Sequence, residues 1–335
     1  MKRLWVLPVL LLSGAVRVCG AETPQEQLER LQRSIEGASE LGRVDRVKVL
    51  RLELAETLDH LSDYAGAARQ YELVLASRPL KRERVKLFVK LGRMRSAMQN
   101  YSGAIGAFQD ARHDDPKDWD ANLELARAYA HADLDTLAVG VYQRCIALRP
   151  KNHQPYGEIG DVYQRLGYLH KAIEAYQKAL QIEPKPETYL SMADCYVRQG
   201  DMVNATAVLQ QAKTSLPRAD YDVRLGDIYR KQEDFNQAVK AWEEALKADR
   251  KRDDVRLKLF LAYHQLNRPQ ETDHMMKQLV AGYPESPLVH FVKAWVLFDR
   301  GDRSGARREA MVVQGLVPTD LVRHYNERLL VLLNK

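Results

Sequence analysis

Three basic residues recur at a spacing that could hold an anionic ligand. Lys86, Lys90 and Arg93 follow one another at intervals of four and three residues, so on a helix they would share one face. Such a face can hold carboxylates, phosphates or an anionic lipid surface through ion pairs. An ordinary solvated helix face has the same composition, and both interpretations stay open at this point.

Three acidic residues stand at equal intervals in the middle of the chain. Asp161, Asp194 and Asp227 lie 33 residues apart, and a basic residue follows each of them by four positions (Arg165, Arg198, Lys231). An acid followed by a base four residues later stabilises its own helix by about 0.2–0.5 kcal/mol, which accounts for any single pair. In a column, the three carboxylates would also form a polar wall that can hydrogen-bond an extended peptide.

Motifs for catalysis or metal binding are not found in the sequence. The nine His residues are scattered, and no HExxH pattern or paired Cys cluster occurs. GxSxG, a phosphate-binding glycine–lysine loop and GxGxxG are missing as well. We therefore expect a protein that is not an enzyme and that holds no metal and no organic cofactor.

The element that would position the charged residues is clearest between His153 and Pro184. Small and aromatic residues alternate there at helical spacing in two groups. Gly160 and Ala172 are small enough to let two helices approach, while Tyr163 and Tyr176 would fill the space around them. Gly167 permits a turn between the helices, and Pro184 ends the second one. The stretch predicts one helix–turn–helix unit.

The same frame recurs along the chain. Its small first-helix residue returns as Ala55, Gly92, Ala126, Gly160, Ala193, Gly226 and Ala294. Prolines close most of the units, at Pro116, Pro150, Pro184, Pro217, Pro284 and Pro318. They lie 33 or 34 residues apart except where Arg250 replaces one of them. The frame predicts eight repeats that begin near Lys48, Val85, Trp119, His153, Pro186, Ala219, Asp253 and Pro287.

This pattern resembles the tetratricopeptide repeat over about four fifths of the chain, with the period expected of such arrays. The resemblance implies an all-α fold, a right-handed superhelical solenoid of eight helix–turn–helix repeats over residues 48–320. We expect capping helices over residues 22–47 and 321–335, since the end repeats would otherwise leave an apolar face in water. Pro79 and Pro116 enclose three residues more than usual, and the extra length falls at residues 80–84 as a loop or a helix extension.

The resemblance also implies where partners bind. In similar proteins the first helix of each repeat lines an inner surface that holds partner segments. Repeats that bind chaperone tails use Lys and Asn residues there, whereas this chain has Gly157, Asp161, Leu190 and Asp194 at the corresponding positions. We therefore do not expect chaperone-tail binding.

The last two repeats would make this inner surface apolar. Leu288 and Trp295 fall at inward positions, and large apolar residues, Trp above all, dominate interface energetics. His290 and Lys293 take positions that are normally core, so the eighth repeat could instead be rotated, with its aromatic residues packed on the terminal helix. The candidate partner-binding residues are Lys86, Lys90, Arg93, Arg127, Asp161, Asp194, Asp227, Leu257, Leu261, Phe291, Trp295 and Phe298.

Residues 1–21 resemble a secretory signal peptide. Lys2 and Arg3 precede an apolar run, and small residues around Cys19 suit cleavage before Glu22. We expect a bacterial protein that is exported to the periplasm or secreted to the medium. The alternatives are a retained N-terminal membrane anchor and a lipidated Cys19, the latter disfavoured by the residues just before it.

Charge and cysteine usage narrow the function further. The formal charge of +6 falls to +3 without the three basic residues of the signal-like segment, which argues against general nucleic-acid binding. Cys145 and Cys195 fall in different repeats, so we expect two small core residues rather than a disulfide or metal pair.

The sequence thus predicts an exported, non-enzymatic scaffold that binds proteins or peptides on its inner face and helps to assemble an envelope complex. The alternative is a periplasmic or membrane-docked accessory subunit of a polysaccharide or pilus export machine. Neither the partner nor the oligomeric state follows from the pattern.

Overall fold

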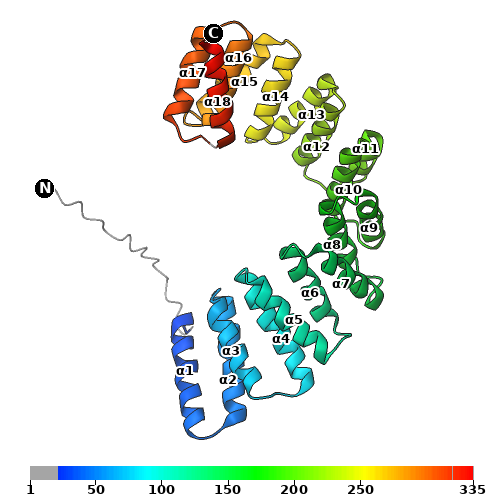
Figure 1. Cartoon of the computed structure of the whole chain (residues 1–335), viewed down its shortest axis with the longest axis vertical. Helices are drawn as coiled ribbons and strands as arrows, with labels where there is room; N and C mark the ends of the chain where they lie inside the picture. Colours follow the sequence, from blue (N-terminus) through cyan, green and yellow to red (C-terminus); the bar gives the residue numbers. More distant parts are fainter. Residues whose placement is uncertain (1–21, 319, 335) are drawn as a thin grey trace, which may run out of the picture. The chain divides into compact units, whose positions relative to one another are not determined.

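The computed structural model describes residues 22–318 and 320–334, and in this part of the chain it holds eighteen α-helices and no strand (Figure 1). The prediction of an all-α chain is confirmed. The predicted signal peptide at residues 1–21, with Cys19, lies outside the described residues. The helices form two compact units that meet in sequence between Pro150 and Lys151.

The first unit contains seven helices among its described residues. They are α1 (Pro24–Glu40), α2 (Val44–His60), α3 (Tyr64–Ala76), α4 (Lys81–Ala97), α5 (Tyr101–Asp114), α6 (Trp119–His131) and α7 (Asp135–Leu148). Consecutive helices pack on each other throughout, and α4 also contacts α6. The extra residues before Val85 lengthen α4 at its N-terminus, so they form a helix extension rather than a loop.

The second unit contains eleven described helices. They are α8 (Gln154–Arg165), α9 (Leu169–Ile182), α10 (Pro186–Gln199), α11 (Met202–Gln211), α12 (Arg218–Lys231), α13 (Phe235–Ala248), α14 (Asp253–Gln265), α15 (Pro269–Gly282), α16 (Pro287–Asp299), α17 (Arg303–Gly315) and α18 (Asp320–Leu333). The last helix packs on both α16 and α17. The side-chain amide of Asn326 there donates to the Ala310 carbonyl of α17 at 2.9 Å, which fixes where α18 lies along that pair.

The turns within the helix pairs follow one local design. The residue two positions before the second helix adopts positive φ, as at Gly167 (79°) and Gly200 (82°), a conformation that glycine reaches without strain. An Asp often comes next and caps the second helix. Asp201 and Asp234, for example, accept the backbone N–H of the residue three positions on. The role predicted for Gly167 is confirmed.

Close contact between a glycine and an aromatic ring closes three of the repeats. A Cβ added at Gly160 would lie 2.5 Å from the Tyr176 ring, and one at Gly226 would lie 2.4 Å from the Trp242 indole. Gly92 meets Phe108 in the same way. The three rings are almost fully buried. The predicted use of a small residue at this position is therefore confirmed: the ring occupies the volume where a side chain would be.

Both described cysteines, Cys145 and Cys195, lie in the core with no exposed surface, as predicted. Burial raises the pKa of the Cys195 thiol from 9.0 to about 11. The pKa of the Tyr71 hydroxyl on α3 is raised as well, from 10.0 to about 12. Burial is the main cause, and the nearby carboxylates of Glu56 and Asp59 add to it. Both groups therefore stay neutral in the folded protein to a higher pH than they do in the unfolded chain.

We expect stability to fall on the alkaline side for this reason. Between pH 9 and 12 the unfolded chain loses these protons while the folded protein keeps them, so rising pH favours unfolding. The urea midpoint should be unchanged from pH 7 to 8.5 and should then decrease. Cys195→Ala should show a shallower decrease between pH 9 and 11. An equal decrease in this variant would contradict the assignment.

Candidate functional site

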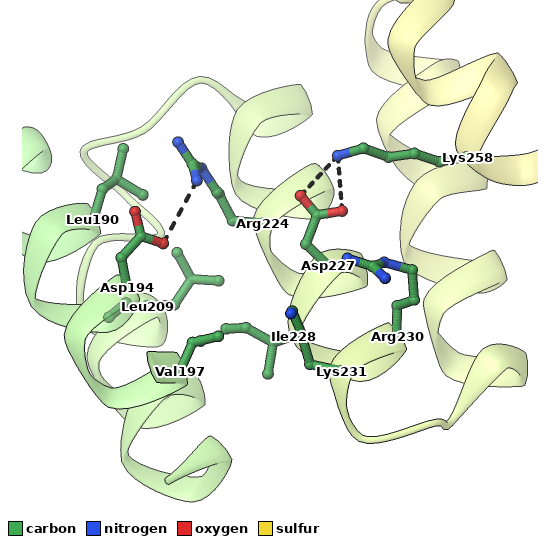
Figure 2. A pocket seen from close by; sticks show the side chains of 11 residues that line it. Leu190, Asp194, Val197, Leu209, Arg224, Asp227, Ile228, Arg230, Lys231 and Lys258 are labelled. Atoms are coloured by element: carbon green, nitrogen blue, oxygen red, sulfur yellow. Dashed lines mark hydrogen bonds and ion pairs between the residues drawn. The ribbon is translucent and has the colours of Figure 1, made fainter. Parts of the chain in front are cut away.

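The first helices of three successive repeats, α10, α12 and α14, line one pocket in the second unit. The pocket has a volume of about 250 Å³ and opens between α10 and α12 (Figure 2). On α10, Leu190, Asp194 and Val197 are spaced four and three residues apart, which places them on one side of the helix. The pocket is completed from α11 by Leu209 and from α14 by Lys258.

The floor of the pocket is apolar. Leu209 and Ile228 are buried, while Leu190 and Val197 are half-buried and pack against them. Four aliphatic side chains from three helices thus form an apolar floor below a charged rim (Figure 2). Such a floor can receive one apolar side chain, since removing apolar area from water contributes about 25 cal/mol per Å².

The rim consists of ion pairs that join neighbouring repeats. Asp194 of α10 lies 3.6 Å from Arg224 of α12. Both carboxylate oxygens of Asp227 accept from the Lys258 amine of α14 at 2.7 Å. Our prediction paired these carboxylates within their own helices and is wrong here: Arg198 donates to the backbone carbonyl of Gln164 at 3.0 Å instead. In both ion pairs the carboxylate is bound by a cation from the first helix of the next repeat.

The third acidic residue of the predicted column has a different partner. Asp161 of α8 accepts a hydrogen bond from the Tyr176 hydroxyl at 2.7 Å. Desolvation raises its pKa, and that hydrogen bond opposes the rise. Desolvation also raises the pKa of Asp194, opposed by Arg224. Each of the three carboxylates therefore has a partner within the protein, while Asp161 and Asp194 keep exposed surface. That the three form a polar wall for an extended peptide stays a prediction.

The predicted basic face in the first unit is mostly neutralised. Lys90 pairs with Glu56 of α2 at 2.6 Å, and Arg93 pairs with Glu124 of α6 at 3.0 Å. Arg127 lies 3.5 Å from the same Glu124. Because acidic groups of neighbouring first helices pair with these cations, the face offers less unpaired positive charge than the spacing alone suggested. Its use in binding anions stays a prediction.

Lys86, the remaining member of that face, is exposed beside a hollow of about 480 Å³. The residues lining the hollow have balanced charges: they include the cations Lys81, Arg82 and Lys86 and the carboxylates Asp114, Asp115 and Asp118. The site has no excess of positive charge for an anion, and we do not assign it a ligand.

The two interpretations of the last repeats each hold for some residues. Phe291 and Phe298 of α16 are partly buried and pack on the cluster that contains Leu329 of α18. Leu257 likewise packs on the core of the second unit. Trp295 and Leu261 remain 46% and 47% exposed. Phe291 and Phe298 therefore pack toward the terminal helix, as the interpretation of a rotated repeat predicts. Trp295 and Leu261 are exposed, as the interpretation of an apolar inner surface predicts.

Sequence reasoning placed Leu190 on the inner surface but missed the rest of the pocket floor and the cations that close its rim. Leu190 and Val197 carried a signal, because they share the helical spacing of Asp194. Arg224 and Lys258 follow their carboxylates by 30 and 31 residues, slightly less than one repeat. A search for opposite charges at that separation would have found both pairs, and it would also have found Arg93 with Glu124.

No described helix has the length and apolar character needed to cross a bilayer. Within the same residues no group of three or more His, Cys, Asp or Glu side chains is arranged to hold a metal ion.

Comparison with known families places the repeats. Residues 89–153 and 223–273 match one model described as a tetratricopeptide repeat, and residues 153–186 match a second model with the same description. A general transcriptional corepressor of Dictyostelium discoideum, trfA, is 25% identical over 101 residues. That match covers 30% of this chain and only 7% of the corepressor.

Solved structures show the same fold at low identity. A tetratricopeptide repeat protein from Parabacteroides merdae has a TM-score of 0.56 with 9% identity, covering 76% of this chain and all of that one. The C-terminal part of a repeat-containing protein from Cytophaga hutchinsonii has a TM-score of 0.60 with 16% identity, covering 71% and 97%. PilW, a type IV pilus biogenesis factor, reaches 0.50 with 20% identity, covering 60% and 94%.

The chain therefore contains tetratricopeptide repeats, and the predicted resemblance is confirmed in this respect. Arrays of this kind are protein-interaction scaffolds whose stacked repeats present an extended binding surface.

Proposed function

We propose that this array of tetratricopeptide repeats is a non-enzymatic scaffold that binds an extended segment of a partner protein on the first-helix face of its second unit. The observation that carries the proposal is the pocket between α10 and α12, with its aliphatic floor and charged rim. Interfaces combine an apolar, desolvated centre with a polar surround in this way. The floor would supply affinity, and the rim would fix the register of the bound segment.

Exposed apolar residues of α14 and α16 supply a second contact for the partner. Leu261 and Trp295 leave nearly half of their surface in water. Trp is among the residues most enriched at binding hot spots. In this proposal the partner segment extends from the pocket toward Trp295.

Trp295→Ala should weaken partner binding with little loss of stability. The partner is first identified by cross-linking in native cells and is then purified, and its affinity for each variant is measured by calorimetry. A hot-spot Trp contributes about 2 kcal/mol or more, which corresponds to at least about thirtyfold in Kd. Thermal unfolding of Trp295→Ala should stay close to that of the wild type, because the side chain is half exposed.

Phe291→Ala is the contrasting variant on the same helix. Its ring packs on the C-terminal cluster, so this change should lower the melting temperature clearly and affect binding less. Unchanged affinity in Trp295→Ala would remove Trp295 from the site. Unchanged affinity in both Trp295→Ala and Leu190→Ala would overturn the proposed binding face.

We further propose that the protein is exported and acts in assembling an envelope complex. What supports this is the signal-like pattern of residues 1–21. The alternative role, an accessory subunit of a polysaccharide or pilus export machine, is in keeping with a fold shared with PilW. Mass spectrometry of the mature N-terminus tests the location: a start near Glu22 supports export, an acylated Cys19 supports membrane docking, and an intact Met1 contradicts cleavage.

A further inference from the structure

The pocket between α10 and α12 has more positive than negative charge. The residues lining it include four cations and two carboxylates: Arg224, Arg230, Lys231 and Lys258 against Asp194 and Asp227. Lys258 is committed to Asp227 through two short hydrogen bonds. Arg224 balances Asp194, although their 3.6 Å separation is beyond a direct hydrogen bond. Two cations are left over.

The surplus lies on Arg230 and Lys231 at the end of α12. Both side chains are exposed, and within the described residues neither makes an ion pair or a side-chain hydrogen bond. Cations at this end of a helix also interact favourably with the helix dipole, which explains why they are tolerated side by side. Lys231 follows Asp227 by four residues, so its amine lies on the pocket side of α12, near Ile228 (Figure 2).

We infer that the pocket recognises an internal peptide segment in which an aliphatic residue and an acidic residue stand two positions apart. This inference rests on the proposed function and names the partner chemistry for the same face. Alternate side chains of an extended segment point the same way, about 6.6 Å apart. An aliphatic side chain in the floor would therefore place the second one at the rim, where a carboxylate meets the Lys231 amine and the Arg230 guanidinium.

Size and charge disfavour other occupants. At about 250 Å³ the pocket is smaller than the roughly 300–1,000 Å³ of typical small-molecule sites, so it suits one side chain better than a cofactor. A basic segment would have to displace Lys258 or Arg224 from carboxylates that they already hold. A carboxylate of the partner, in contrast, finds two cations without counter-ions.

The test uses peptide selection on the full-length protein. A library of random dodecapeptides displayed internally, with both ends tethered, is selected against the immobilised chain. Enriched sequences are then synthesised with acetylated and amidated ends, and their Kd is measured by fluorescence anisotropy. We expect enrichment of an aliphatic residue with Asp or Glu two positions away. Replacing that acid by Asn or Gln should weaken binding about tenfold, as for loss of a charge-assisted hydrogen bond.

Variants of the protein locate the contact. Lys231→Glu should weaken the selected acidic peptides at least about tenfold, and a repeated selection on it should favour Lys or Arg at the acidic position. Leu190→Ala should weaken every selected peptide. Lys178→Glu on α9 makes the same charge change at an exposed residue outside the pocket and should alter Kd less than twofold. Thermal unfolding of each variant confirms that it is folded.

The outcomes separate this inference from the proposed function. Peptides that bind but lack the acidic residue, or that bind Lys231→Glu as well as the wild type, would overturn the inference and leave a binding scaffold in place. Binding that needs a free C-terminal carboxylate would also overturn it. Failure to enrich any peptide, with Trp295→Ala and Leu190→Ala both without effect on the native partner, would overturn the proposed function as well.

Discussion

Gly226→Val should lower the free energy of unfolding by about 3 kcal/mol. This is the largest loss of stability that we predict for a single substitution in this chain. A Cβ at position 226 would lie 2.4 Å from the Trp242 indole nitrogen. The indole is fully buried, and its N–H donates to the Val223 carbonyl at 3.3 Å. The ring cannot withdraw without losing that hydrogen bond and opening the contact between α12 and α13. Overpacking of a core typically costs about 1–3 kcal/mol, and a lost buried hydrogen bond adds to it.

Urea unfolding followed by circular dichroism measures this loss. Gly157→Ala provides the matched control, because an added Cβ there meets no atom within 4 Å and the residue lies inside α8. Alanine in place of an unconstrained helical glycine should stabilise by about 0.5–1 kcal/mol. Opposite signs are thus expected for two substitutions of glycine in the same unit. A Gly226→Val variant with an unchanged urea midpoint would show that Trp242 is not held as described.

The packing of the repeats could be predicted from the sequence because few residue types satisfy it. Two helices that cross closely need a small residue facing a ring, and a short turn at positive φ favours glycine. The sequence therefore predicted both the contact of Gly160 with Tyr176 and the turn at Gly167, and the structure confirms both. These requirements are local, and the repetition of the frame strengthened each of them.

The candidate site was less predictable, because its contacts join different repeats. The pairing of an acid with a base four residues later applies within a single helix. It therefore assigned Arg198 and Lys231 to carboxylates of their own helices. In the structure Lys258 of the next first helix holds Asp227, which leaves Lys231 available. The sign of the charge offered to a partner consequently changes from negative to positive. Only the positions of neighbouring helices could decide this.

The eighth repeat was ambiguous for a related reason. His290 and Lys293 of α16 occupy positions that are apolar in other repeats, and the sequence alone did not show what would balance them. Glu309 of α17 does so: its carboxylate lies 2.7 Å from the His290 ring nitrogen Nδ1 and 2.7 Å from the Lys293 amine. The second ring nitrogen lies 2.7 Å from the Pro284 carbonyl oxygen. A carboxylate oxygen and a carbonyl oxygen both accept, so each ring nitrogen of His290 faces a hydrogen-bond acceptor.

Glu309→Gln should therefore destabilise the protein by about 2 kcal/mol at pH 7, the cost of removing the charge from two charge-assisted hydrogen bonds in a poorly solvated position. Burial tends to raise the pKa of Glu309, but the hydrogen bonds from Lys293 and His290 outweigh it and hold the pKa below its usual value. A lowered carboxyl pKa means that this stabilisation is present above about pH 4.5 and is lost as the pH falls through the folded-state pKa.

Acid unfolding separates this electrostatic role from simple packing. Gln has the shape of a protonated Glu, so the urea midpoints of the wild type and Glu309→Gln should differ at pH 7 and should approach each other as the pH falls below about 4.5. The matched control is Glu174→Gln on α9, an exposed residue whose change should stay within about 0.5 kcal/mol at both pH values. A difference for Glu309→Gln that persists undiminished at pH 3 would show that its neighbours respond to shape rather than charge. In that case Glu309 would not be what allows a histidine and a lysine to occupy core positions of the last repeat.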